Sequence, residues 1–105
     1  RNRRAGDEAL RLAEGARAAV PGNAIIESTY GCALSDAGRN QEAIAVLDAV
    51  IKARPTDSWA EYCLGRSQIE NGLKAEASVH LGRALELDAH FPRRDEVRKM
   101  LDSAH

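Results

Sequence analysis

Two cysteines and three histidines are the first candidates for nucleophilic and metal-binding chemistry in this 105-residue chain. Cys32 and Cys63 are far apart in the sequence, whereas zinc sites and disulfide scaffolds use closely spaced pairs. A reactive thiol needs a neighbouring base, but His80, His90 and His105 fall in other segments. The sequence also lacks a phosphate-binding glycine loop, a nucleophile elbow and a paired-histidine metal motif. We therefore expect no enzyme activity, no metal site and no cofactor.

The composition is typical of a folded, soluble domain. Charged residues make up 30% of the chain and hydrophobic residues 44%, with a net charge of −1 at pH 7. This balance provides no positive surface for nucleic acid, and no segment approaches the about 18 apolar residues of a membrane span. We expect no nucleic-acid partner and no direct membrane insertion. The chain begins without methionine, and we expect it to be part of a longer protein.

A repeat of 34 residues organises the chain. The dipeptide Glu-Ala occurs at residues 8–9, 42–43 and 76–77, each 34 residues after the one before. Two pairs of glycines keep the same interval, namely Gly31 with Gly65 and Gly38 with Gly72. We expect Gly38 and Gly72 to provide the left-handed residue that ends a helix.

Apolar residues in each copy recur every three or four positions, which predicts helices and no strands. Asn23, Asn40 and Ser58 stand where N-caps are expected, and Ser58 with Glu61 forms a capping-box pattern. We expect helices at about 5–19, 24–37, 41–53, 58–71, 75–87 and 93–103. The short connections make consecutive helices antiparallel.

A 34-residue unit of two helices, with small residues where the helices cross and a proline after the second, resembles the tetratricopeptide repeat. Residues 24–57 and 58–91 resemble complete repeats, and residues 1–23 resemble the second helix of a partial repeat. Residues 92–105 are expected to form a C-terminal capping helix. The resemblance implies an all-α, right-handed solenoid of antiparallel helix pairs.

The packing expected for this solenoid uses small residues at the helix crossings. Gly31 and Gly65 should let two helices approach closely, while Leu47 and Leu81 fill the space beside them. The first helix lacks the preceding helix that should cover its Ala9, Ala13 and Ala16 face. We expect this face to be exposed and to allow self-association.

In the repeat architecture, Cys32 and Cys63 lie on the first helices of neighbouring repeats, and both are expected on the concave face. A disulfide requires Cα atoms within about 7 Å of one another, and stacked helices often exceed that distance. We therefore expect Cys32 and Cys63 to be partly buried free thiols, with a disulfide as the alternative.

The resemblance implies that partners bind on the concave face formed by the first helix of each pair. The predicted partner-binding residues are Ile25, Ser28, Cys32, Trp59, Tyr62, Arg66, Ile69 and Glu70. Trp, Tyr and Arg are enriched at binding hot spots, and we expect an exposed Arg66 to contribute little to folding. Trp59 and Tyr62 could instead pack against a neighbouring helix, and Arg66 could pair with Asp36 or Glu70.

These patterns predict a protein–protein interaction module, a scaffold or adaptor that binds a partner peptide or helix on its concave face. The excess of 12 arginines over 3 lysines, together with 19 alanines, is typical of a bacterial genome rich in GC. We therefore place the module within a larger bacterial assembly protein. The alternative is a structural spacer or self-association segment with no ligand in the groove.

Overall fold

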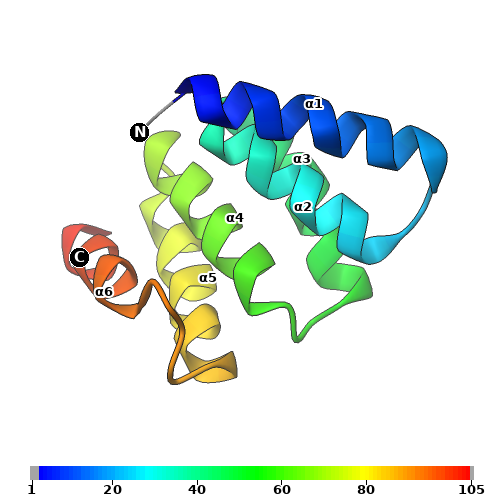
Figure 1. The fold of residues 1–105 in the computed structure, drawn as a ribbon. Helices are drawn as coiled ribbons and strands as arrows, with labels where there is room; N and C mark the ends of the chain where they lie inside the picture. Colours follow the sequence, from blue (N-terminus) through cyan, green and yellow to red (C-terminus); the bar gives the residue numbers. More distant parts are fainter. Residues whose placement is uncertain (1–2, 105) are drawn as a thin grey trace.

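The computed structural model describes residues 3–104, which form six helices and no strand (Figure 1). The helices are α1 (Arg3–Ala19), α2 (Ala24–Asp36), α3 (Asn40–Ala53), α4 (Ser58–Glu70), α5 (Lys74–Leu87) and α6 (Arg94–Ala104). The expected all-α fold is confirmed, and each helix begins and ends within two residues of its expected bounds.

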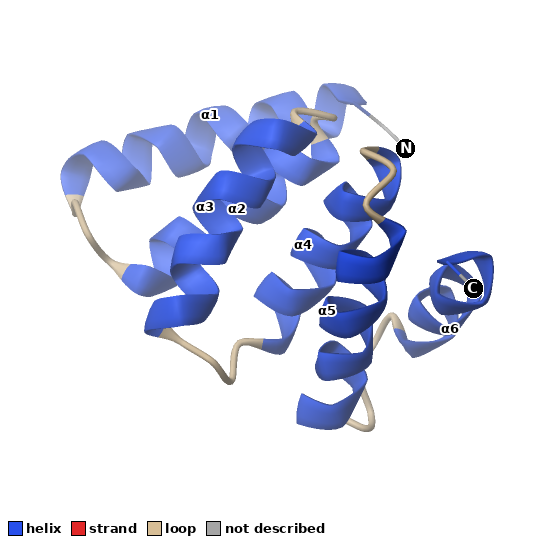
Figure 2. Ribbon diagram, turned by 180° about the vertical axis from the view of Figure 1, so that it is seen from behind, coloured by secondary structure: helices blue, strands red, loops and turns tan. Residues whose placement is uncertain are grey.

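The helices form an elongated stack of 40 × 27 × 22 Å. Helices α2 and α4 pack side by side, and each is paired with the helix that follows it, α3 or α5 (Figure 1). Seen from behind, α3 and α5 form the nearer layer (Figure 2). At the two ends of the stack, α1 packs against α2, and α6 packs against α5 and α4.

Glycines end α2 and α4 as expected. Gly38 and Gly72 have φ angles of 81° and 77°, in the region that favours glycine. The Arg39 amide donates to the Leu34 carbonyl at 2.9 Å, and the Leu73 amide donates to Gln68 at 2.8 Å. These bonds across the helix end satisfy carbonyls that would otherwise lack a partner.

Of the three predicted N-caps, Asn23 is confirmed, because its side chain accepts a bond from the Ile26 amide at 3.0 Å. Ser58 is the first residue of α4, and Asp57 caps this helix instead by accepting from the Ala60 amide at 3.0 Å. Asn40 is likewise the first residue of α3 rather than its cap. The reason is that the turn after α2 passes through Gly38 and leaves a single residue, Arg39, in the cap position before α3 begins.

Close approach within each helix pair depends on Gly31 and Gly65. A Cβ atom added at Gly31 would lie 2.6 Å from Leu47 Cγ, and one added at Gly65 would lie 2.6 Å from Leu81 Cγ. Both leucines are fully buried. The expected role of these glycines in the helix crossings is therefore confirmed.

Replacing Gly65 by alanine should lower the free energy of unfolding by about 1–2 kcal/mol, because overpacking outweighs the gain in helix propensity. Gly82 is the matched control, because it lies inside α5 and no atom lies within 4 Å of a Cβ added there. Gly82→Ala should raise the free energy of unfolding by about 0.5–1 kcal/mol. Urea denaturation of both variants measures the two signs, and a stabilised Gly65→Ala variant would contradict this packing.

The uncovered face of α1 differs from the expected one at Ala13. Ala13 is buried, because it continues the stripe of Gly6 and Leu10 that faces α2, whereas Ala9 is exposed and Ala16 is half-buried. Leu12 shares the face of Ala9 and is 77% exposed. The open face is therefore centred on Leu12.

Candidate functional site

Three aromatic rings form a cluster at the junction of α4 with the segment before α6. The Trp59 ring lies 4.7 Å from the Phe91 ring and 5.7 Å, edge-on, from the Tyr62 ring. Trp59 keeps 44% of its surface exposed, whereas Tyr62 is 2% exposed. The cluster therefore holds Trp59 in one position while leaving part of it open to solvent.

Tyr62 is covered by the C-terminal segment. Its hydroxyl donates to Glu96 Oε1 at 2.9 Å, and its ring lies 5.4 Å from that of Phe91. Burial raises the pKa of the Tyr62 hydroxyl, although the nearby Arg66 acts in the opposite direction. Tyr62 therefore remains a neutral hydrogen-bond donor that ties α4 to α6.

Arg66 occupies a polar seam between α2 and α4. Its guanidinium pairs with Asp36 and donates from Nε and Nη2 to Ser35 Oγ at 3.2 and 3.1 Å. The Ser67 hydroxyl lies 2.7 Å from Ser35 Oγ. The Arg66 side chain is 16% exposed. Arg66 is thus not the exposed residue that the sequence predicted, and it takes the alternative pairing with Asp36.

Arg66→Ala should lower the free energy of unfolding by about 1–3 kcal/mol, because Ser35 and Asp36 would lose their charged donor inside the seam. The matched control is Arg39→Ala, which removes an exposed arginine paired with Glu42 and should change stability little. Chemical denaturation compares the two variants. Equal stability of wild type and Arg66→Ala would show that the seam contributes nothing to folding.

The two cysteines are joined in a disulfide between α2 and α4, so the expected free thiols are wrong. The Cα atoms of Cys32 and Cys63 lie 5.3 Å apart, within the range a disulfide requires. Small side chains along the seam, such as Ser35 and Ser67, allow α2 and α4 to approach this closely. The general spacing of stacked helices therefore overestimated the distance at this position.

A mainly apolar hollow of about 290 Å³ opens beside Trp59. We call it the inner hollow, and it is lined by Ala9 of α1, Ser28, Thr29, Cys32, Ala33 and Asp36 of α2, and Trp59 of α4. Asp36 is its single charged lining residue, and its carboxylate remains partly exposed beside Arg66. The inner hollow therefore offers apolar surface with one acidic edge.

The inner hollow brings together three residues of the predicted partner-binding set, Ser28, Cys32 and Trp59. Ile25 lies one turn before Ser28 on α2 and is 64% exposed. Tyr62 and Arg66 are mostly enclosed, as described above, and Ile69 is half-buried against the core. The sequence reasoning missed Ala9, Thr29 and Ala33, because it assigned Ala9 to the open face of α1 and not to a site shared with α2.

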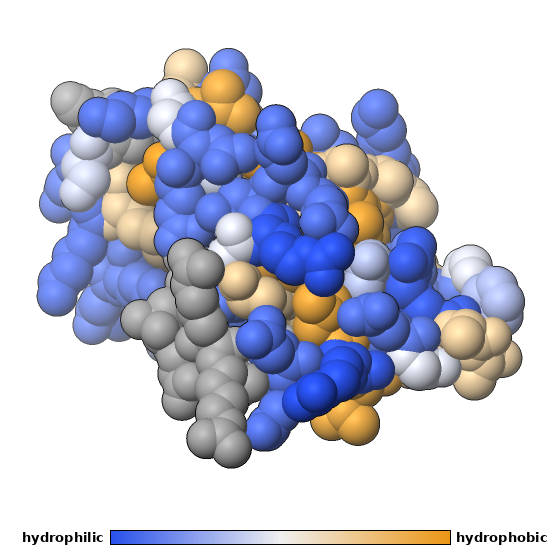
Figure 3. All heavy atoms as spheres, turned by 90° about the horizontal axis from the view of Figure 1, so that it is seen from above, coloured by the Kyte–Doolittle hydropathy of each residue, from blue (hydrophilic) through white to orange (hydrophobic). Residues whose placement is uncertain are grey.

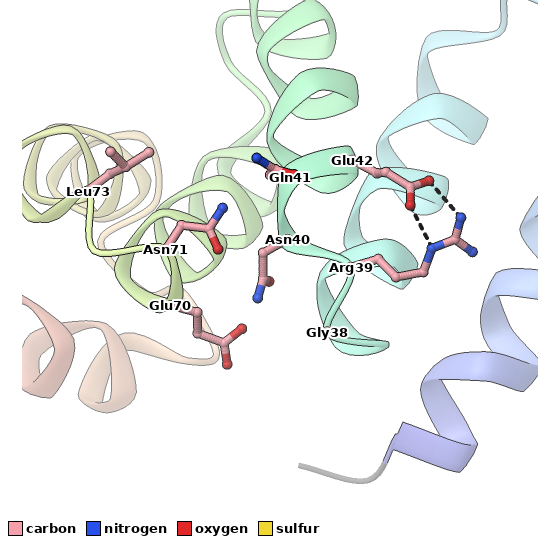
Figure 4. Close-up of a pocket in the computed structure, with 8 residues that line it drawn as sticks. All are labelled: Gly38, Arg39, Asn40, Gln41, Glu42, Glu70, Asn71 and Leu73. Atoms are coloured by element: carbon pink, nitrogen blue, oxygen red, sulfur yellow. Dashed lines mark hydrogen bonds and ion pairs between the residues drawn. The ribbon is translucent and has the colours of Figure 1, made fainter.

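Glu70, the last member of the predicted set, lines a different hollow of about 710 Å³ at the turns (Figure 4). Glu70 and Asn71 at the end of α4 and Asn40 at the start of α3 border it, while Arg39 and Glu42 pair with each other on the side nearer α2 (Figure 4). Its lining is mainly polar and lacks the aromatic surface of the inner hollow.

Glu61 does not form the predicted capping box. Its carboxylate is buried and lies 2.8 Å from His80 Nδ1 and 3.4 Å from Arg83 Nε. This cluster joins α4 to α5 and provides partners for a carboxylate buried inside the stack.

The third histidine of the sequence, His105, lies outside the described residues.

The described residues show no metal-binding cluster and no helix that could span a membrane. Within residues 3–104, no group of three or more His, Cys, Asp or Glu side chains could hold a metal ion. None of the six described helices is both long enough and apolar enough to cross a membrane. Seen from above, most of the surface is hydrophilic, with small separate apolar patches (Figure 3).

The sequence is similar to those of known proteins. The sequence model of the tetratricopeptide repeat family matches residues 3–58 and 34–101. Over 71 residues, the chain is 35% identical to cellulose synthase operon protein C of Escherichia coli strain K12 and to the putative cellulose synthase operon protein C of Escherichia coli O157:H7. These matches cover 68% of this chain and 6% of each relative.

Proposed function

Because the chain belongs to the tetratricopeptide-repeat family, whose repeats are generally protein-interaction modules, we propose that it binds a segment of a partner protein in the inner hollow. The family is typically non-catalytic, and we propose a binding role without enzyme activity for this chain. Since the chain spans 6% of the length of the relatives it matches, we place it within a larger bacterial protein.

The position of Trp59 carries this proposal. Its ring borders the inner hollow and is held by Phe91 and Tyr62, yet nearly half of its surface faces solvent. A rigid, exposed aromatic side chain beside an apolar hollow loses little conformational entropy when a partner covers it. Ile25, exposed on the same face of α2, extends the apolar surface.

The lining of the inner hollow defines the chemistry of the partner segment. An apolar side chain would fill the space between Ala33 and Trp59, where it removes apolar surface from water. A lysine, arginine or amide donor would lie at the acidic edge near Asp36, whose carboxylate keeps exposed surface. Arg66 then acts by holding Asp36 in place rather than by contacting the partner.

The second candidate is a structural role, favoured by the uncovered face of α1. By the 34-residue repeat, Ala9 corresponds to Ala43 of α3 and Ala77 of α5, which are fully buried in the stack. A further helix placed before α1 would cover Ala9 and fill the inner hollow. Under this alternative, the chain is a spacer or self-association segment whose hollow is filled by another repeat helix.

Selection of a phage-displayed library of 12-residue peptides on the disulfide-intact protein tests the proposal. The affinity of a selected peptide is measured by the emission of Trp59, the single tryptophan, and by calorimetry. Thr29→Arg adds bulk at an exposed position of the inner hollow and should weaken binding at least about tenfold. Val79→Ala, at an exposed site on α5, should leave the affinity unchanged.

Equal affinities of wild type and Thr29→Arg would contradict binding in the inner hollow. A synthetic helix with the sequence of residues 58–71 separates the two candidates, because it reproduces a first helix of the repeat. If this helix binds and no library peptide competes with it, the structural role is supported and the partner-binding role is contradicted.

A further inference from the structure

The two ends of the Cys32–Cys63 disulfide differ in their access to solvent. Cys32 is half-buried and lines the inner hollow, whereas Cys63 is 2% exposed. The neighbours of Cys63 along α4, Leu64 among them, are also buried. Cys32 is therefore the cysteine of the pair that a molecule entering the inner hollow meets.

Thiol–disulfide exchange depends on which sulfur the attacking thiolate can reach. We propose that the disulfide is a thiol-exchange site with a single entry, at which a small-molecule thiol enters the inner hollow and modifies Cys32. Cys63 is the leaving residue. This site requires no bound partner protein, so it is independent of the proposed function.

The exchange proceeds in two balanced steps. The thiolate of the small molecule forms a bond to Cys32 Sγ, the bond between the two cysteines breaks, and the electron pair leaves with Cys63 Sγ, which takes up a proton. A second thiolate then attacks the sulfur of the small molecule on Cys32. The products are the oxidised dimer of the small thiol and two reduced cysteines, so two small thiols are oxidised for each disulfide reduced.

The surroundings of Cys32 suit both the adduct and the free thiol. The adduct would extend into the inner hollow, which has about 290 Å³ of space. The reduced Cys32 thiol has an acceptor in place, because Cys32 Sγ lies 3.7 Å from the backbone carbonyl oxygen of Trp59. Because Trp59 lines the same hollow as Cys32, we expect its emission to report the state of the disulfide.

Glutathione is the probe for the first test, on the wild-type protein. The protein is treated briefly with reduced glutathione, the exchange is quenched with acid, and the mixed disulfide is located by peptide mass spectrometry. We expect the adduct on the Cys32 peptide at least about tenfold more often than on the Cys63 peptide. Equal amounts on both, or an excess on Cys63, would overturn the proposal.

Two single variants provide the second test, in which each protein keeps one thiol. In native buffer with oxidised glutathione, Cys63→Ala should form its adduct on Cys32 at least about tenfold faster than Cys32→Ala forms one on Cys63. In denaturant the two rates should become similar, because access then no longer differs. Similar rates in native buffer, with circular dichroism showing both variants folded, would contradict the proposal that small thiols reach Cys32 and not Cys63.

Discussion

Replacing Cys32 and Cys63 together by alanine is expected to lower the free energy of unfolding by about 3–4 kcal/mol. The disulfide joins residues separated by 31 positions, and it restricts the unfolded chain to conformations that keep them together. Without it, the unfolded chain gains that freedom, whereas α2 and α4 retain their other contacts in the folded state. Urea denaturation under oxidising conditions measures the difference.

Reduction of the wild-type protein provides the control for this prediction. A reducing agent should destabilise the wild type by a similar amount and leave the double variant unchanged. If the double variant and the oxidised wild type unfold at the same urea concentration with the same slope, the disulfide does not stabilise this fold.

Leu81→Ala is expected to lower the free energy of unfolding by about 3 kcal/mol, because it leaves a cavity where α4 and α5 cross. Leu81 is fully buried and fills the space beside Gly65. Leu12→Ala is the matched control, because Leu12 is exposed on α1 and its truncation should change stability by less than about 0.5 kcal/mol.

A double-mutant cycle separates this cavity from other effects. The added Cβ of Gly65→Ala occupies part of the space vacated in Leu81→Ala, so the double variant should lose less stability than the sum of the single variants. Strict additivity would show that Gly65 and Leu81 do not compete for the same space.

The repeat in the sequence was sufficient to predict the helices and their crossings. The spacing of Gly31 and Gly65 predicted the close contacts with leucine, and Gly38 predicted the end of α2. The helix starts were less certain, because Asp57 and Ser58 are adjacent and both suit an N-cap. Backbone geometry decides between such neighbours, and the sequence pattern does not contain it.

The candidate site was predicted in part, because helical periodicity identifies which residues share a face but not what covers them. Trp59 and Cys32 do border the same hollow. Tyr62 shares the predicted stripe with Trp59, yet Phe91, at the end of the second repeat, and Glu96 of α6 enclose it. The sequence alone gave no measure of how the segment from Phe91 to α6 folds back.

The disulfide depended on a distance that no residue pattern specifies. Whether Cys32 and Cys63 can bond is decided by how closely α2 and α4 approach at one level of the stack. That approach follows from several small contacts, including those of Ser35 with Ser67 and Arg66. A general value for helix spacing does not resolve differences of this size.

Methyl NMR with a library-selected peptide tests most directly whether the inner hollow is the binding site. We expect the methyl signals of Ala9, Thr29 and Ala33 to shift on titration, because these side chains line the inner hollow. The signals of Ala45 and Ala49, exposed on α3, should not move. Shifts confined to Ala45 and Ala49, with Ala9, Thr29 and Ala33 unchanged, would contradict partner binding in the inner hollow.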